Sequence, residues 1–459
     1  MEERVEVMQQ ENKMGTMPVG KLLFSMSLPI ILSMLVQALY NIVDSIFVAR
    51  ISEDALTAVS MAAPIQTLFI AVGAGTGVGV NALLSRALGE RDPEKASKIG
   101  RNGIFLAAAS YVVFLIFGII GVRGFYAMQT DSADIIQYGT EYLSIVCCLS
   151  VGLFMQIIFE RLLQATGRTV YTMCIQLLGA VINIILDPIL IFGWFGLPAM
   201  GVTGAALATV IGQIVGATVG FFINRRKNPE IDVRMKGFRP CGQTIRQIYQ
   251  IGVPSILMQA IGAVTTFLIN KILIGFTTTA VAVYGIYFKL NMFVFMGVLG
   301  INNGMVPIIS YNYGARNKER MMKTVKLALI SAVGILSAGT ILLEFIPRTI
   351  LALFNASDHM YSMGVPAIRI IALHLPVAAV VVIFGSVLQA IGRAFYSMLA
   401  SLCRQLIVLV PAIYVLSLFG EVNYVWYAFL LAETVAAIIS CAFFAQGYRK
   451  IIKPLGVQR

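Results

Sequence analysis

Two aspartates lie inside long apolar stretches of the sequence, each with polar neighbours at helical spacing. Gln37, Tyr40 and Asp44 follow one another at intervals of three and four residues, and Asn183 precedes Asp187 by four, so each set shares one helix face. A carboxylate within a membrane span costs about 2.5–3.5 kcal/mol even on a permissive insertion scale. Two facing carboxylates become tolerable when they share a proton or a metal cation. The pattern therefore predicts a site for H⁺ or Na⁺.

The depth of the two aspartates supports this interpretation. Both are expected four or five residues from the outer ends of their spans, and Thr209 in the next span falls at a similar level. Na⁺ would be bound by Asp44 and Asp187 with oxygens from Asn183 and Thr209. The alternative is that Asp44 meets water at the headgroup level and that Asp187 caps local structure; the matched depth favours the cation site.

The elements that carry these residues are predicted to cross a membrane. The 459-residue chain is 58% hydrophobic and 12% charged, whereas a soluble domain has about a quarter charged residues. Its mean hydropathy is +0.84. Crossing the hydrocarbon core takes roughly 20 apolar residues. Twelve stretches qualify: 22–48, 56–85, 99–122, 135–159, 170–192, 200–224, 248–275, 280–310, 325–346, 362–387, 394–418 and 423–446.

The distribution of basic residues predicts the orientation. Most Lys and Arg residues fall in connections on the side of the N-terminus, among them Arg161 and Arg168 after the fourth span. By the positive-inside rule both termini are cytoplasmic. Anionic lipid headgroups account for the net charge of +12 without a nucleic-acid partner.

The chain contains an internal repeat with a constant offset. The sequence separation between Gly89 and Gly314 recurs between Gly167 and Gly392 and between Pro29 and Pro254, in matching local sequences. This separation is the repeat offset. An even number of spans per repeat gives parallel halves. We therefore predict an all-α polytopic membrane protein with two six-helix bundles related by a pseudo-two-fold axis along the membrane normal. The predicted parts are a cytoplasmic N-terminal segment (1–21), an N-lobe (22–224), a basic linker (225–247), a C-lobe (248–446) and a cytoplasmic tail (447–459).

Such a parallel repeat is typical of transporters that expose a cleft to alternate sides, although duplication for stability alone would also produce it. The aspartates are not repeated, because Ile269 and Ala412 occupy the equivalent positions. This asymmetry predicts that the N-lobe carries the coupling ion.

An aromatic and methionine stripe in the eighth span is a candidate substrate surface, with core or lipid-facing packing as the alternative. The predicted substrate-binding residues are Gln37, Gln66, Tyr284, Tyr287, Phe288 and Met292.

Enzyme classes are disfavoured. The run GAGTGVG (73–79) lies within a span and lacks the lysine of a phosphate-binding loop, so it predicts close helix packing instead. No nucleophile elbow or HExxH motif is present. We expect no enzymatic activity and no cofactor, and an ion gradient as the energy source.

The chain resembles the multidrug and toxic compound extrusion (MATE) transporters over nearly its full length. The resemblance is carried by SLPIILSMLVQALYNIVDSIFVAR, the LGERD loop, LLQATGR with the matching LQAIGR of the second half, and NIILDPILIFG followed by GAALAT. It implies twelve helices in two lobes and export of cationic, amphipathic compounds in exchange for H⁺ or Na⁺. It implies a multi-pass protein of the bacterial inner membrane, acting as a monomer. The bacterial branch with an N-lobe cluster fits best, and its coupling residues correspond to Asp44, Asp187, Asn183 and Thr209, with Tyr40 nearby.

Two rival functions remain open from the sequence. A flippase for an anionic lipid-linked precursor would use the basic residues in or near C-lobe spans, namely Lys271, Lys289, Arg369 and Arg404. A membrane-embedded enzyme or receptor is the second, and the lack of a catalytic motif in the sequence argues against an enzyme.

Overall fold

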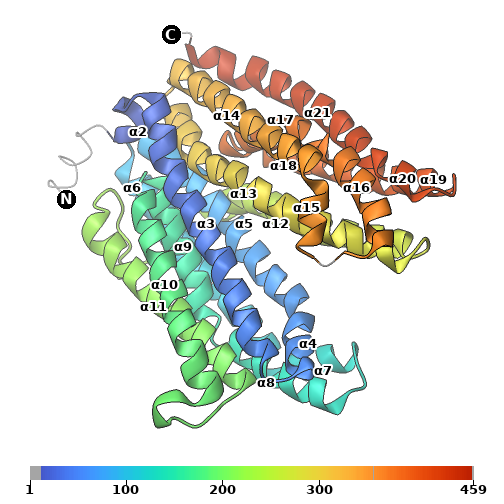
Figure 1. Ribbon diagram of the computed structural model, residues 1–459. Helices are drawn as coiled ribbons and strands as arrows, with labels where there is room; N and C mark the ends of the chain where they lie inside the picture. The colour runs from blue at the N-terminus through green and yellow to red at the C-terminus, as the bar shows by residue number, and fades with distance from the viewer. Residues whose placement is uncertain (1–11, 355, 457–459) are drawn as a thin grey trace. The chain divides into compact units, whose positions relative to one another are not determined.

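The computed structural model describes residues 12–354 and 356–456, and every regular element within these ranges is helical (Figure 1). The first half contains α2 (Lys13–Thr16), α3 (Val19–Ala49), α4 (Glu53–Met61), α5 (Ala63–Gly89), α6 (Pro93–Ile120), α7 (Val122–Ala127), α8 (Ala133–Cys148), α9 (Val151–Ala165), α10 (Thr169–Phe192), η1 (Trp194–Gly196) and α11 (Val202–Lys227). The second half contains α12 (Gly242–Leu273), α13 (Thr278–Gly314), α14 (Lys318–Phe345), α15 (Pro347–Ala352), α16 (Asp358–Ala372), α17 (Leu375–Ala390), α18 (Ala394–Leu402), η2 (Cys403–Leu409), α19 (Val410–Ser417), α20 (Val422–Val425), α21 (Tyr427–Gly447), η3 (Tyr448–Ile452) and η4 (Lys453–Gly456).

The number of spans agrees with the prediction. Within the described residues, 10 spans are long and apolar enough to cross a bilayer, and two further spans are bent pairs, which gives up to 12. The pair α8 and α9 bends by 45°, and the pair α16 and α17 bends by 44°. The bends occur at equivalent positions of the two halves. The chain is a multi-pass membrane protein, and the all-helical, twelve-span prediction is confirmed.

The helices form two compact units whose boundaries fall beside prolines. Unit 1 contains the chain up to Thr16 and Leu28–Val253, and unit 2 contains Met17–Ser27 and the chain from Pro254 onward. Helices α3 and α12 therefore each contribute to both units. Pro29 lies just after the first boundary and Pro254 directly after the second. Since proline removes one backbone hydrogen bond and clashes with the preceding turn, both helices are weakest where they pass from one unit to the other.

The internal repeat is visible in the local geometry of both halves. Helix N-caps recur at the repeat offset, and in each case the side chain accepts a hydrogen bond from the backbone N–H three residues on; the pairs are Ser52 and Thr277, Asp92 and Asn317, and Ser132 and Ser357. Gly167 and Gly392 both have φ of 81°. The hydroxyls of Ser85 and Ser310 donate to the carbonyls of Ala165 and Ala390, both at 3.0 Å.

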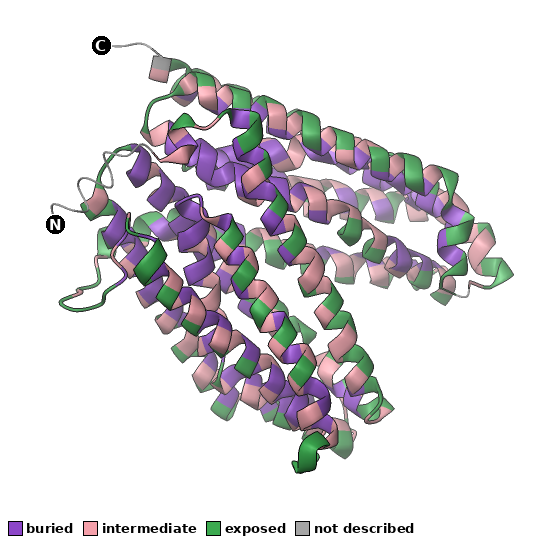
Figure 2. Ribbon diagram, turned by 60° about the vertical axis from the view of Figure 1, so that its left-hand side comes forward, coloured by how far each residue is buried: buried purple, intermediate pink, exposed green. Residues whose placement is uncertain are grey.

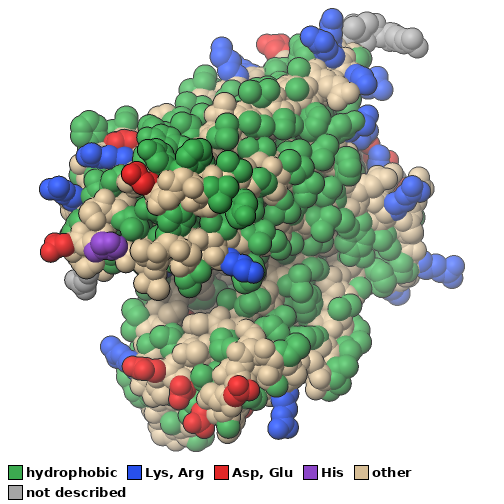
Figure 3. Space-filling model, turned by 90° about the vertical axis from the view of Figure 1, so that its right-hand side faces the viewer, with side chains coloured by type: hydrophobic (Ala, Val, Ile, Leu, Met, Phe, Trp, Pro, Cys, Tyr) green, Lys and Arg blue, Asp and Glu red, His purple; other side chains and the backbone are tan. Residues whose placement is uncertain are grey.

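Within each unit, buried residues line the contacts between helices and exposed residues cover the outward faces (Figure 2). The face in Figure 3 is largely hydrophobic, and most of its charged side chains lie near the margins of the view, as expected of a protein surrounded by hydrocarbon. In unit 2 a core cluster joins α12, α13, α16, α19 and α21 around the fully buried Trp426.

Candidate functional site: an aspartate cluster in unit 1

The two aspartates lie on helices whose C-terminal ends meet. The rings of Phe47 at the end of α3 and Phe192 at the end of α10 are 6.2 Å apart, in an edge-to-face arrangement. Asp44 and Asp187 lie three and five residues before these rings, and the two carboxylates repel each other electrostatically. Asp187 is 0% exposed. The Oδ1 atom of Asp44 is buried and has no hydrogen-bond partner in the described part of the chain.

Asn183 joins Asp187 to the neighbouring helix α11. When its amide nitrogen faces Asp187 it donates to Oδ2 at 3.2 Å, while its amide oxygen accepts from the hydroxyl and the backbone N–H of Thr209 at 3.2 and 3.1 Å. The amide thus fixes the position of the buried carboxylate relative to α11. A hydrogen bond to the charged form of a carboxylate stabilises that form without neutralising it.

Small residues bring α10 and α11 close enough for this bridge. A Cβ added to Gly212 would lie 2.7 Å from the carbonyl oxygen of Gly179, and one added to Gly204 would lie 2.5 Å from that of Leu190. Backbone contact at two levels holds Thr209, which lies between them, against Asn183. This is close packing of the kind that small residues permit in membranes.

The polar face of α3 completes the cluster. Tyr40 is hydrogen-bonded to Gln37 and interacts electrostatically with both aspartates. Gln66 contributes indirectly, because its Nε2 donates to the hydroxyl of Tyr142 at 3.0 Å and Tyr142 in turn interacts with Asp44. Tyr142 was not predicted from the sequence, because a single tyrosine in an apolar span carries no distinguishing signal.

Around the two carboxylates the cluster offers the amide of Asn183 and the hydroxyls of Thr209 and Tyr40. Among the described residues no group of three or more His, Cys, Asp and Glu side chains could hold a metal ion. The chemistry present is suited to a proton or an alkali cation, since hard cations prefer oxygen ligands.

The predicted aromatic residues of unit 2 separate into two environments. Tyr284 and Tyr287 are 5% and 1% exposed and belong to the core cluster. Phe288 and Met292 are 47% and 60% exposed. The rings of Tyr284 and Phe288 are 6.4 Å apart, so the stripe runs from the core to the surface.

Unit 1 contains a further buried carboxylate that the sequence interpretation did not single out. Glu160 in α9 is 6% exposed and accepts hydrogen bonds from Gln156 and Gln176 at 3.0 and 2.8 Å. Its neighbour Arg161 was expected in the connection that follows the fourth span, but it lies within a helix. Helix α9 continues to Ala165, and the Nη1 of Arg161 donates to Gln164 at 3.0 Å within it.

Two of the four C-lobe basic residues have acidic partners. The Nη1 of Arg404 lies 3.0 Å from Glu433 Oε2, and the Nε of Arg369 lies 3.8 Å from a Glu344 carboxylate oxygen. Lys271 and Lys289 are exposed.

Comparison with known proteins identifies the family. The MatE family model matches residues 29–189 and 254–415, two segments whose first residues, Pro29 and Pro254, are related by the repeat offset. The multidrug export protein MepA of Staphylococcus haemolyticus (strain JCSC1435) is 28% identical over 424 residues, covering 92% of each chain, and MepA of Staphylococcus aureus (strain MRSA252) is 27% identical over 425 residues with the same coverage.

Solved structures share the fold. A multidrug resistance MATE family transporter of the MOP superfamily, in an outward-facing conformation, superposes with a TM-score of 0.89 at 23% identity, covering 97% of this chain and 98% of that one. A MATE crystal structure in a bent conformation gives 0.90 at 22% identity, with 99% of both chains covered. The chain therefore belongs to the MatE family, as its resemblance to the multidrug and toxic compound extrusion transporters predicted.

Proposed function

We propose that this protein is a secondary active multidrug exporter that expels cationic, amphipathic organic compounds in exchange for H⁺ or Na⁺. The observation that carries the proposal is the aspartate cluster, in which Asp187 is fully buried and repelled by Asp44. The MepA relatives are multidrug export proteins, which agrees with the proposal.

The coupling argument follows from the cost of the charges. With both aspartates ionised, their repulsion adds to the cost of removing each from water. A proton or Na⁺ bound between α3 and α10 relieves that repulsion and draws the two helices together. Releasing the cation on the other side of the membrane restores it. The cation thereby changes the relative free energy of two arrangements of α3, and Pro29 provides the point at which this helix bends most easily.

The available driving force is adequate. One charge crossing 100 mV provides about 2.3 kcal/mol. Each pH unit adds about 1.36 kcal/mol. Together they support an accumulation ratio of a few hundredfold for an exchange of one cation for one neutral substrate. Exchanging one cation for one monocationic substrate moves no net charge, so a monocationic substrate reaches such a ratio when two cations enter for each molecule exported.

The proposal is tested by ethidium efflux from proteoliposomes in which only a pH gradient or only a Na⁺ gradient is imposed. The wild-type protein should respond to one of the two gradients. Asp44→Asn and Asp187→Asn should each abolish the gradient-driven component, because the amide can neither bind a proton nor balance Na⁺. Asp54→Asn is the matched control, since Asp54 is exposed near the start of α4 and should leave efflux unchanged. Equal gradient-driven efflux by wild type and both cluster variants would overturn the assignment of the site.

The proposed location, oligomeric state and division into lobes rest on the sequence analysis. We place the protein in the bacterial inner membrane as a monomer with both termini cytoplasmic, divided into the N-lobe, linker and C-lobe described above. The flippase alternative gains no support, because Arg404 and Arg369 each have an acidic partner.

A further inference from the structure

Unit 2 contains a polar cavity that the coupling mechanism does not use. Its volume is about 170 Å³, against about 30 Å³ for one water in the liquid, so it accommodates a group of several non-hydrogen atoms. Helices α12, α13, α17, α18, η2 and α21 supply its walls. The polar residues that line it are Asn302, Ser386, Gln389, Ser397, Ser401, Arg404 and Ser440.

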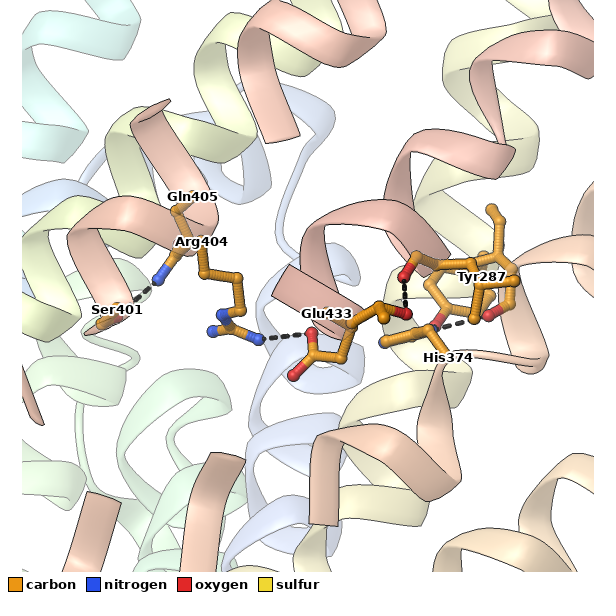
Figure 4. Close-up of polar contacts among 9 residues, drawn as sticks. Tyr287, His374, Ser401, Arg404, Gln405 and Glu433 are labelled. Carbon is orange, nitrogen blue, oxygen red and sulfur yellow. Dashed lines mark hydrogen bonds and ion pairs between the residues drawn. The ribbon is translucent and has the colours of Figure 1, made fainter. Parts of the chain in front are cut away.

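The charge of this cavity is one-sided. Among the described residues that line it, Arg404 is the only charged one. Glu433 pairs with Arg404 but is not part of the lining, and Figure 4 shows the guanidinium directed toward Glu433, while Ser401 is hydrogen-bonded to Gln405. Within the described ranges, the Arg404 Nε and the hydroxyl of Ser440, a residue only 1% exposed, have no hydrogen-bond partner. The Ser401 hydroxyl accepts a hydrogen bond from Gln405 at 3.0 Å and can still donate its own proton. The Arg404 Nε and the hydroxyls of Ser440 and Ser401 therefore form a set of donors suited to an anion.

The internal repeat shows which anion fits. At the repeat offset, Gly385 in this cavity is equivalent to Glu160 of unit 1, and Ser401 is equivalent to Gln176. In unit 1 the Glu160 carboxylate fills the position and accepts a hydrogen bond from Gln176 at 2.8 Å. In unit 2 the carboxylate-bearing side chain is replaced by glycine, while a hydrogen-bonding residue is kept at the second position.

The local packing explains how the glycine maintains the cavity. A Cβ on Gly385 would lie 2.9 Å from the Ser397 hydroxyl, so any side chain there would intrude on the lining. The counter-charge also differs between the halves, because Arg404 replaces Gly179 at the equivalent position. Unit 2 thus has no carboxylate at the position of Glu160 and has a cation, Arg404, whose partner Glu433 lies outside the lining.

We propose that this cavity binds a carboxylate group supplied from outside the chain, held by Arg404, Ser401 and Ser440. The carboxylate belongs either to a small free monocarboxylate or to a transported organic compound. Binding draws on the unpartnered Nε of Arg404, while Nη1 stays on Glu433. The ligand therefore joins an existing ion pair as a second acceptor, which predicts weak, millimolar affinity for the free ion.

The binding test uses the full-length protein in detergent, with thermal unfolding as the readout and acetate as the probe. Acetate titrated through the millimolar range should raise the unfolding midpoint, because a ligand that binds only the folded state stabilises it. Acetamide, which has the same shape without the charge, should have no effect. Gly385→Ala should weaken the acetate response at least tenfold, and Ser401→Ala should weaken it without burying an unpaired charge. Arg369→Gln, which changes an exposed arginine of the same unit, should respond like wild type.

An acetate response that acetamide reproduces, or one that survives intact in both Gly385→Ala and Ser401→Ala, would overturn the proposal. This result does not depend on transport, so it is separable from failure of the proposed export function. A second arm identifies the source of the carboxylate. Efflux of a xanthene dye with a free carboxylate is compared with efflux of its methyl ester. Selective loss of acid export in Gly385→Ala assigns the site to the substrate; equal export of acid and ester, with acetate binding intact in wild type, assigns it to a free monocarboxylate.

Discussion

Replacing Gly79 with alanine should separate two helices that are in backbone contact within unit 1. Gly79 belongs to the glycine run of α5, and a Cβ at this position would lie 2.3 Å from the carbonyl oxygen of Ile248 in α12. A second contact supports the first, since a Cβ on Gly252 of α12 would lie 3.1 Å from the carbonyl oxygen of Gly75. The obstructing atoms are backbone, so no rotation of a side chain relieves the clash.

The magnitude follows from these distances. Ordinary van der Waals contact begins near 3.4 Å, so α5 and α12 must move apart by about 1 Å at Gly79. Inserting a methyl group into a well-packed contact typically costs about 1–3 kcal/mol. Gly334 of α14 provides the matched control, because it is exposed, lies mid-helix and has no atom within 4 Å of an added Cβ. Gly334→Ala should be neutral or stabilising by up to about 1 kcal/mol, since alanine restricts the unfolded chain.

The assay is thermal unfolding of the purified variants in one detergent, with ligand-free wild type as the reference. Gly79→Ala should unfold at a clearly lower temperature than wild type and Gly334→Ala at the same temperature or higher. If the two variants unfolded together, the glycine run would not be the site of close packing between α5 and α12, and the interpretation of GAGTGVG as a packing motif would fail.

Three further outcomes are expected. The hydroxyl and backbone N–H of Thr244 hydrogen-bond to the Cys241 thiol and lower its pKa to about 7. The rate of Cys241 alkylation by iodoacetamide should therefore reach half its maximum near pH 7. Thr244→Val removes the hydroxyl and should move that midpoint to higher pH. Gly392→Ala should cost about 1–2 kcal/mol, measured as a lower unfolding midpoint, because φ is 81° there even though no atom lies within 4 Å of an added Cβ. Arg404→Met should destabilise the protein by about 3–5 kcal/mol in the same unfolding assay, because it leaves Glu433 buried without its partner. The double variant Arg404→Met/Glu433→Leu should recover most of that lost stability.

Periodicity and length were enough to predict the spans and the helix faces of the aspartates. A carboxylate in an apolar helix must be accommodated, and spacing alone indicates which neighbours share its face. The bends inside the fourth and tenth spans were not predicted, because length and mean hydropathy are nearly the same for a bent span and a straight one. In the tenth span a local signal was present, since His374 lies at the break and a proline occupies the first turn of α17. Hydropathy measures transfer to lipid and is insensitive to the direction in which a helix continues.

The missed residues have a common physical cause. Glu160 is stabilised by Gln176 from another helix, and Tyr142 is linked to Gln66 from another, so their roles arise from pairs far apart in the sequence. For the aromatic stripe, the sequence suggested a ligand surface that composition alone cannot distinguish from core packing. Tyr284 and Tyr287 have the composition of a ligand surface, yet whether a stripe faces the core or the outside depends on the helices packed against it.

The second half of the chain provides an internal argument about the charges of the first. Both halves keep the same caps and turns, because these are set by local backbone geometry. The buried carboxylates are not kept: Asp44, Asp187 and Glu160 have uncharged counterparts at the repeat offset. The scaffold therefore folds without an acidic side chain at any of these positions. Each buried charge costs free energy of folding. Unit 1 therefore bears a cost at these positions that unit 2, with the same scaffold, does not. Structural need therefore does not account for the aspartates, which supports the cation site that we propose.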